Sequence, residues 1–458
     1  MQKIKKIPGS FRDPDGYVFS HEESIYRCIT HNYQDNYEHF IASGLYKALT
    51  SENLLIKHIE IDKTENFPKD AFKVIKPYLI PFISYPYEWC FSQLKQAALT
   101  TLKIQKTSMR FKMSLKDCSA YNIQFLHNRA VLIDTLSFEK YDEFRPWPAY
   151  RQFCQHFLAP LALMSYKDVR LNQLLRIFID GIPLDMASAL LPKSTYLNLP
   201  LFLHIHLHAR FQKKLSSRKS PSFLKANRLG LLGMLEQLES LIKNLKFKTA
   251  NNNWHNYYQD NSYSNAAFTH KKEIVSEFLD IINPKTIWDL GANKGIFSSL
   301  AAKKGSLVIA FDNEPGLIEK FYLNCQKTGS SNILPLVLDL SNPSPDIGWE
   351  NKERTSLFNR GPAHTIMALA LIHHLTISNN VSLKRIAAFF ANNCTWAIIE
   401  FIPKDDPQAI KLLTSRKDIF SSYTRKNFEK TFSTLFKIHS QTKIKESKRT
   451  VYLIEKIK

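Results

Sequence analysis

The clearest hydrophobic pattern lies in the second half of the chain, where short apolar runs alternate with stretches of helical periodicity. The helical stretches predict helices over residues 271–282, 295–304, 315–327 and 382–392. The short apolar runs predict buried strands over residues 286–290, 307–311, 333–338, 365–371 and 396–402. Buried strands that alternate with helices form a mostly parallel sheet covered on both faces. The pattern therefore predicts an α/β domain.

The first half of the chain has a less regular pattern, with one long helix expected over residues 88–107. A Lys-, Arg- and Ser-rich stretch over 213–228 and an Asn-rich stretch over 249–264 are typical of connecting segments. A chain of 458 residues is too long for one ordinary hydrophobic core. We therefore expect two domains, over residues 1–245 and 246–458.

Composition narrows the class of protein without naming an activity. With 44% hydrophobic residues and no run of about 18 apolar residues, we expect a soluble protein without a membrane span. The six cysteines form no CxxC pair, which favours reduced thiols in a cytoplasmic protein. The net charge of +21 would suit nucleic acid, but the lysines are spread along the chain. A small-molecule substrate is favoured, and a nucleic-acid partner stays open.

The first candidate site is a glycine turn between the first predicted strand of the α/β domain and the helix after it. The strand carries Asp289 near its end, and the turn reads Gly291-Ala-Asn293-Lys-Gly295. Glycine is needed where a ligand approaches the backbone closely, because a Cβ would clash there. A glycine turn alone also occurs in dinucleotide-binding domains, so the residues after the next strands decide the interpretation.

Acidic residues follow the next two strands, and two histidines follow the fourth. Asp312 could accept hydrogen bonds from both ribose hydroxyls of a nucleoside. Asp339 could accept a hydrogen bond from the exocyclic amine of adenine. His373 and His374 come after the fourth strand, and ligands of open α/β sheets bind at the carboxyl ends of the strands.

These residues together resemble the motif series of class I S-adenosylmethionine (SAM)-dependent methyltransferases. The resemblance implies a Rossmann-like domain in which the first motif holds the methionine part of SAM and the two later acids hold ribose and adenine. The cofactor-binding residues that it implies are Asp289, Gly291, Asn293, Gly295, Asp312 and Asp339. Asn293 departs from the glycine that is more common in the family. The alternative of a dinucleotide-binding dehydrogenase needs GxGxxG, which Gly291-Ala-Asn293 breaks.

Methyl transfer is an in-line displacement, and an acceptor that is a hydroxyl, an acidic carbon or a protonated amine must also lose a proton. Histidine suits this task because its pKa lies near working pH, so His374 is the preferred base and His373 the second choice. One of the two could instead pack or cap the following helix. Glu400 could hold a substrate group, orient His374, or form a salt bridge with Lys404 or Lys411. The Asn-Pro-Pro-Tyr motif of many adenine and glutamine methylases is absent, which favours an oxygen or carbon acceptor.

A second constellation lies in the first half, where Asp117 precedes Asn122 and a further apolar strand leads to Asp134. This order resembles the catalytic and metal-binding segments of kinase-like phosphotransferases. The resemblance implies an α+β domain in which Asp117 is the base and Asn122 and Asp134 hold Mg²⁺. The flanking residues differ from the usual motifs, and no glycine-rich phosphate loop precedes them. We therefore expect a degenerate domain that recruits substrate, with Mg-ATP binding as the alternative.

Two further segments have a structural and a functional interpretation. The aromatic-rich stretch 144–157 is expected to be mostly core, although it could line a cleft for an aromatic or sugar substrate. His204, His206 and His208 form an HxHxH run. On a helix the first and third would share a face, but no cysteine or carboxylate completes a zinc site.

The whole arrangement resembles bacterial SAM-dependent methyltransferases, nodulation-associated ones among them. The resemblance does not supply the methyl acceptor, which we expect to be a small molecule or a saccharide or lipid-linked intermediate. Methylation of RNA or protein, a bifunctional kinase–methyltransferase, and a protein that only senses SAM remain the alternatives.

Overall fold

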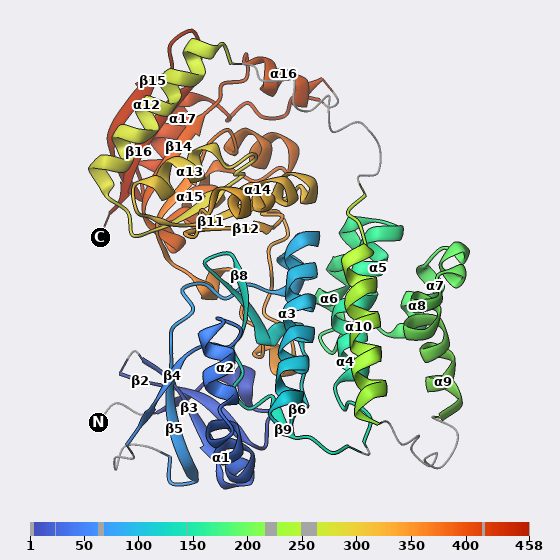
Figure 1. Cartoon of the computed structure of the whole chain (residues 1–458). Helices are drawn as coiled ribbons and strands as arrows, with labels where there is room; N and C mark the ends of the chain where they lie inside the picture. Colours follow the sequence, from blue (N-terminus) through green and yellow to red (C-terminus); the bar gives the residue numbers. More distant parts are fainter. Residues whose placement is uncertain are drawn as a thin grey trace. The chain divides into compact units, whose positions relative to one another are not determined.

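A computed structural model gives the fold, and it describes residues 4–22, 24–62, 68–143, 145–215, 227–248, 263–414 and 417–457. The chain divides into two compact units (Figure 1). Unit 1 comprises Met1–Lys248 and Asp346–Arg354, and unit 2 comprises Thr249–Pro345 and Thr355–Lys458. The segment Asp346–Arg354, which the sequence interpretation placed in the second domain, thus belongs to unit 1.

Unit 2 is built on a seven-stranded sheet in the order β12-β11-β10-β13-β14-β16-β15. Its strands are β10 (Thr286–Leu290), β11 (Leu307–Asp312), β12 (Ile333–Val337), β13 (Ala363–Ala368), β14 (Cys394–Phe401), β15 (Phe436–Lys443) and β16 (Thr450–Lys456). The first five strands in this order run parallel, while β16 pairs antiparallel with β14 and with β15. The chain starts in the middle of the sheet and winds outward in both directions, which is the doubly wound, Rossmann-like arrangement.

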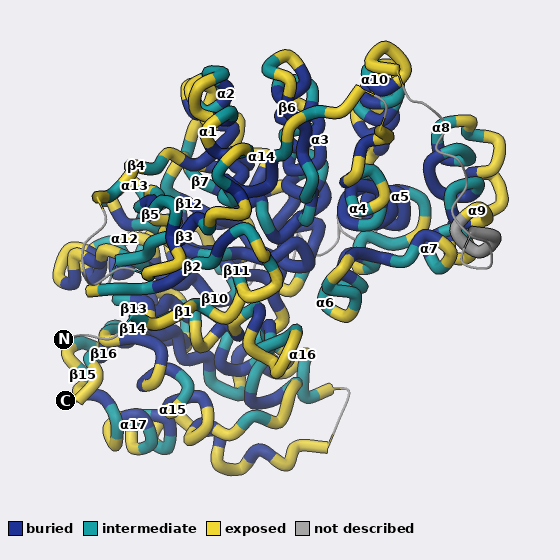
Figure 2. The backbone as a smooth tube through the Cα atoms, turned by 90° about the horizontal axis from the view of Figure 1, so that it is seen from below, coloured by how far each residue is buried: buried dark blue, intermediate teal, exposed yellow. Residues whose placement is uncertain are grey.

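Helices between the strands cover this sheet. They are α12 (Asn265–Ile282), α13 (Ile296–Lys303), α14 (Pro315–Thr328), α15 (Leu383–Asn393), α16 (Pro407–Leu413) and α17 (Arg425–Phe432). The predicted alternation of strands and helices is confirmed from α12 to β14. The central strands are buried almost throughout (Figure 2) because both faces of the sheet are covered. Their core includes Ile287, Val308, Met367 and Ile398, packed with Phe278 of α12.

The register of the parallel strands brings their carboxyl ends to one edge of the sheet. Asp289 of β10 lies opposite Ala310 of β11 and Met367 of β13. The loops that follow these strands therefore begin side by side, and this edge contains the residues of the predicted SAM site.

Unit 1 begins with an antiparallel sheet in the order β1-β2-β3-β5-β4. Its strands are β1 (Lys5–Lys6), β2 (Gly16–His21), β3 (Ser24–Thr30), β4 (His58–Ile61) and β5 (Ala71–Pro77). Helices α1 (Gln34–Ala42) and α2 (Leu45–Ser51) connect β3 with β4. A long helix, α3 (Phe91–Arg110), follows where the sequence predicted one.

Two small antiparallel sheets come next, and helices complete the unit. β6 (Met113–Leu115) pairs with β9 (Phe138–Lys140), and β7 (Ile123–Leu126) pairs with β8 (Arg129–Leu132). The remaining helices are α4 (Tyr150–Phe153), α5 (Ala159–Tyr166), α6 (Leu174–Ile177), α7 (Leu184–Leu190), α8 (Leu199–Leu201), α9 (His208–Leu215) and α10 (Arg228–Asn244). Within the described part of the chain, no helix has both the length and the apolar character needed to cross a membrane.

The segment Asp346–Arg354 lies between β12 and β13 in the sequence, yet its contacts are those of unit 1. Glu353 forms an ion pair with Arg12 at 2.7 Å. The guanidinium of Arg354 lies over the ring of Tyr121 at 4.6 Å from the centroid. These contacts explain why a stretch expected in the α/β domain belongs to the other unit.

Candidate active site

The glycine turn after β10 has a backbone that most side chains could not adopt. Gly291, Asn293 and Gly295 have φ angles of +79°, +50° and +71°, all in the left-handed region. The N–H of Gly291 donates to the carbonyl of Phe311 at 2.9 Å, which ties the turn to β11. A Cβ at Gly295 would lie 1.9 Å from the ring of Phe321, so only glycine fits there. Asparagine tolerates this region better than most residues, which accounts for the departure at Asn293.

Two buried carboxylates flank the turn. Asp289 accepts a hydrogen bond from the Ser298 hydroxyl, and burial raises the pKa of Asp289 to about 6. Asp312 accepts backbone N–H groups of Asn293 at 2.9 Å and Glu314 at 3.0 Å, one on each oxygen. Burial raises the pKa of Asp312, and these backbone hydrogen bonds act in the opposite direction. The backbone N–H of Asn313 also acts on this carboxylate, and the remaining lone-pair capacity could accept a ligand donor such as a ribose hydroxyl.

Asp339 follows β12 and is exposed. Its Oδ1 accepts both the backbone N–H and the hydroxyl of Ser341, at 2.8 and 2.7 Å. Among the described residues no donor bonds the other carboxylate oxygen. The side chain is thus held in one orientation with an oxygen left for a ligand.

The two histidines stand after β13, at the start of a π-helix over His374–Ser378. Their ring centroids are 4.2 Å apart. Burial lowers the pKa of both, and the nearby charges of Arg449 and Lys271 help to lower that of His373 to about 2. His373 is only 2% exposed, and its Nδ1 has no hydrogen-bond partner among the described residues. Ala370, just before them, has a φ of +53°, a strained conformation of the kind that gathers at functional sites.

Glu400 ends β14 inside a buried network of charges. Its carboxylate pairs with Lys271 at 2.7 Å, accepts a hydrogen bond from the Tyr263 hydroxyl, and lies 3.7 Å from Arg449. Arg449 in turn forms two hydrogen bonds with Asp406, at 2.7 and 2.9 Å. Two cations and two anions therefore balance, as buried charges require. The sequence interpretation did not include Lys271, Arg449, Tyr263 or Asp406.

Two expectations for Glu400 are wrong in detail. Neither Lys404 nor Lys411 is its partner, because Lys404 pairs with Asp418 at 2.8 Å and the carboxylate of Glu400 is occupied by Lys271. Within the described residues, Glu400 makes no hydrogen bond to either histidine. Its position at the carboxyl edge of the sheet is as predicted.

In unit 1, the three residues of the kinase-like segment lie in existing hydrogen-bond networks. Asn122 donates its amide to Asp117 at 2.9 Å. Asp134 pairs with Arg27 at 2.7 Å and accepts the Ser137 hydroxyl at 2.7 Å, so both of its oxygens are occupied. The described residues contain no group of three or more His, Cys, Asp or Glu side chains that could hold a metal ion.

The HxHxH run makes hydrogen bonds and ring contacts within unit 1, and the aromatic segment packs there. His204 bonds Tyr150 and Gln237, while His206 bonds hydroxyl groups. His208 stacks on the ring of Tyr150 at 5.0 Å. Of the aromatic segment, Phe144 lies outside the described residues, and Trp147, Phe153 and Phe157 are buried in the core, as expected.

The strand order of unit 2, with five parallel strands, defines a Rossmann-like domain. No family model matches the chain. The chain is 34% identical to the nodulation protein NoeA of Rhizobium meliloti (strain 1021) over 460 residues, covering 98% of this chain and 96% of that protein. The chain belongs to the NoeA family.

Solved structures resemble parts of the chain more distantly. The crystal structure of WbdD has a TM-score of 0.32 and 16% identity, covering 44% of this chain and 42% of that one. A putative O-methyltransferase from Nostoc punctiforme has a TM-score of 0.31 and 15% identity, covering 41% and 56%. Magnesium protoporphyrin IX methyltransferase from Synechocystis, with bound SAH, has a TM-score of 0.31 and 14% identity, covering 44% and 92%.

Proposed function

We propose that unit 2 transfers the methyl group of SAM to an oxygen or carbon atom of a small molecule or of a saccharide or lipid-linked intermediate. The observation that carries this proposal is the pair of buried carboxylates beside the left-handed glycine turn. Asp312 keeps hydrogen-bonding capacity beyond its backbone donors, which a ribose hydroxyl could use. Asp289 would face the ammonium of the methionine part, and Asp339 the adenine amine.

Bound SAM would supply a methyl group from its sulfonium sulfur, and its leaving group would be S-adenosylhomocysteine. The protein then has to orient the acceptor and take its proton. Between the two histidines, His374 suits the role of base better. Burial is the main reason that the pKa of His373 is so low, and His374 and the charges of Arg449 and Lys271 lower it further. The pKa of His374 is lowered by burial alone.

Methyl-labelled SAM and bacterial extract test this function without knowledge of the acceptor. Wild-type protein is expected to transfer label to an extract component, and Asp289→Asn and His374→Ala are expected to lose most of that transfer. Lys404→Ala, which changes a surface ion pair of the same unit, serves as the control. Equal labelling by all four proteins would contradict the proposal.

For unit 1 we infer a kinase-like domain that does not transfer phosphate. Helices α1 and α2 between β3 and β4, and the paired strands β6·β9 and β7·β8 around Asp117 and Asp134, support the kinase-like part. The ion pair between Arg27 and Asp134 supports the inference that this domain does not transfer phosphate. The guanidinium already occupies the carboxylate to which Mg²⁺ would bind. A metal would have to displace an ion pair that is largely buried.

A further inference from the structure

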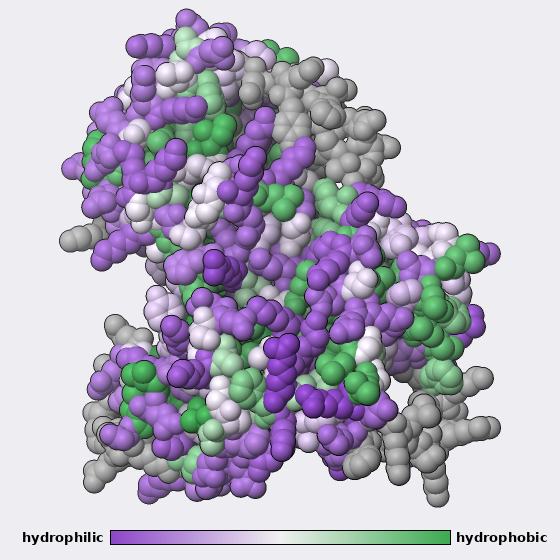
Figure 3. All heavy atoms as spheres, viewed as in Figure 1, coloured by the Kyte–Doolittle hydropathy of each residue, from purple (hydrophilic) through white to green (hydrophobic). Residues whose placement is uncertain are grey.

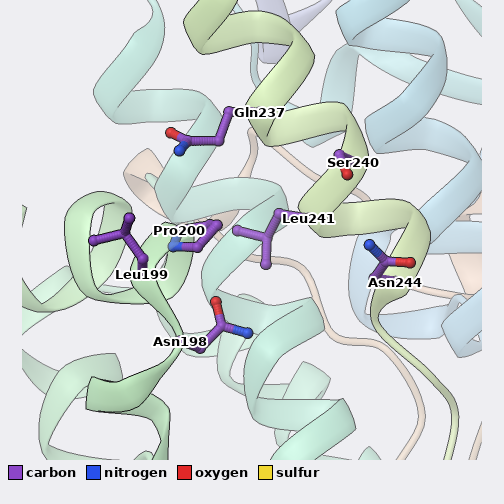
Figure 4. A pocket seen from close by; sticks show the side chains of 7 residues that line it. All are labelled: Asn198, Leu199, Pro200, Gln237, Ser240, Leu241 and Asn244. Carbon is purple, nitrogen blue, oxygen red and sulfur yellow. The ribbon is translucent and has the colours of Figure 1, made fainter.

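A pocket of about 400 Å³ opens in the helical part of unit 1, far along the chain from the residues proposed to bind SAM (Figure 4). Three of its residues come from the start of α8, and four from one face of α10. They are Asn198, Leu199, Pro200, Gln237, Ser240, Leu241 and Asn244. Its volume lies in the range of small-ligand sites, and none of these side chains is charged.

The side-chain amide of Gln237 is held in a fixed orientation by a hydrogen bond with His204. His204 bonds the Tyr150 hydroxyl through Nδ1 at 2.7 Å and the Oε1 of Gln237 through Nε2 at 2.9 Å. Burial lowers the pKa of His204 to about 4, so the ring is neutral at neutral pH. Both bonds are satisfied when the proton is on Nε2 and the Tyr150 hydroxyl donates to Nδ1. Gln237 therefore accepts through its oxygen and has its NH₂ group available as a donor.

The other polar groups add both donors and acceptors. The Asn198 oxygen accepts the N–H of Leu201 at 3.1 Å, which again leaves the NH₂ group. Figure 4 shows the amide nitrogens of Asn198 and Asn244 turned toward the space between the two segments. The side chains of Ser240 and Asn244 make no hydrogen bond to another described residue, so both can donate and accept.

Apolar surface lies beside these polar groups. Leu241 is buried in the wall of the pocket, while Leu199 is 61% exposed and Leu197 next to it is 90% exposed. Figure 3 shows apolar residues gathered on the surface of unit 1 near α7 and α8. A ligand with both hydroxyl groups and an apolar face would use the two kinds of surface together.

We propose that this pocket binds a neutral saccharide, as a mono- or disaccharide unit of a larger glycan or of a glycolipid. Sugar hydroxyls donate and accept, which matches amide and hydroxyl side chains, and the C–H face of a sugar ring packs on leucine and proline. An ionic ligand would find no charge of opposite sign in the lining. A purely apolar ligand would bury amide groups without partners, which is unfavourable. The proposal does not depend on methyl transfer in unit 2.

An array of neutral oligosaccharides of hexoses and N-acetylhexosamines, with acidic glycans beside them, tests this on the full-length protein. Wild type is expected to bind a subset of the neutral glycans. Gln237→Leu and Asn244→Leu should each weaken that binding about 10-fold, the effect of one lost hydrogen bond. Ser240→Phe should abolish it by filling the pocket. Glu236→Leu changes an exposed residue of the same helix outside the pocket, and it should bind as wild type does.

Three results would overturn the proposal: no neutral glycan bound by wild type, binding of acidic glycans alone, or neutral-glycan binding that survives Ser240→Phe. SAM binding measured on the same proteins is expected to be equal in all of them. A loss of glycan binding with SAM binding retained locates the defect in the pocket. Absence of SAM binding in wild type would affect only the function proposed for unit 2.

Discussion

Replacing Glu400 with glutamine is expected to weaken unit 2 by far more than a surface substitution does. Glu400 is fully buried, and its charge balances Lys271 and Arg449 together with Asp406. Glutamine keeps the shape and removes the charge, so one positive charge is left without balance in the interior. Breaking one side of a buried pair costs about 3–5 kcal/mol. We expect the free energy of local unfolding around β14 to decrease by that amount.

The companion variants separate charge balance from packing. Lys271→Met is expected to cost less, because Arg449 and Tyr263 still face the Glu400 carboxylate. The double variant Lys271→Met/Glu400→Gln returns the cluster to neutrality. Its cost should therefore fall short of the sum of the single costs by about 2 kcal/mol.

Amide hydrogen exchange on peptides of α12 and β14 measures this locally, which matters because a chain of two units need not unfold in one step. The matched control is the pair Lys404–Asp418, which is 2.8 Å apart, against 2.7 Å for Lys271–Glu400, but partly exposed. Lys404→Met should cost far less, because an exposed ion pair contributes little to stability. If Glu400→Gln costs no more than this control, or the double-variant costs simply add, the reasoning about the buried network is refuted.

The remaining predictions concern the two proposed sites. SAM binding should weaken as pH falls through 6, and it should be about tenfold weaker at pH 5 than at pH 7. The reason is that Asp289, with a pKa of about 6, must be ionised to hold the ammonium group of SAM. A calorimetric affinity that does not change with pH, or an unchanged pH profile in Asp289→Asn, would contradict this prediction. His374→Gln should lower the rate of methyl transfer about 10²–10⁴-fold, and His373→Gln should lower it less. If labelled-SAM assays show the larger loss in His373→Gln, His373 is the base. Mg-ATP should not raise the melting temperature of unit 1 in wild type. If Mg-ATP stabilises wild type and this stabilisation is lost in Asp134→Ala, phosphotransfer is supported instead. If Mg-ATP stabilises only Arg27→Ala, the result supports the view that Arg27 occupies the position of the metal.

The sequence predicted the sheet from β10 to β14 because these strands are buried on both faces and read as continuous apolar runs. It missed β16 although that strand contains an apolar run, and it missed β15 for the opposite reason. This edge strand alternates buried and exposed positions and carries polar side chains, so no apolar run marks it. The assignment of Asp346–Arg354 to unit 1 depends on contacts such as Arg12–Glu353, which join residues 341 positions apart. No local pattern could have indicated it.

Some residues of the candidate site could likewise be placed from the sequence, and others could not. Asp289 and Asp312 could be predicted because each lies at the end of a recognisable strand. The partners of Glu400 could not, since Lys271 lies 129 positions away and meets it only through the packing of α12 on the sheet. One signal was present: Lys271 precedes Ile274 and Val275 by three and four positions, which places a charge on the apolar face of that helix. A lysine in that position needs a buried acid, and Glu400 supplies it.

The measurement that most directly tests the central claim is calorimetry of SAM and S-adenosylhomocysteine on the full-length chain, with Mg-ATP titrated in parallel. Wild type and the control Asp280→Ala, which removes a surface partner of Lys304, are expected to bind SAM with micromolar affinity. Asp312→Ala should bind about 100-fold more weakly, because two hydrogen bonds from ribose hydroxyls to a carboxylate are lost. SAM binding that is absent from wild type, or unchanged in Asp312→Ala, would contradict the account.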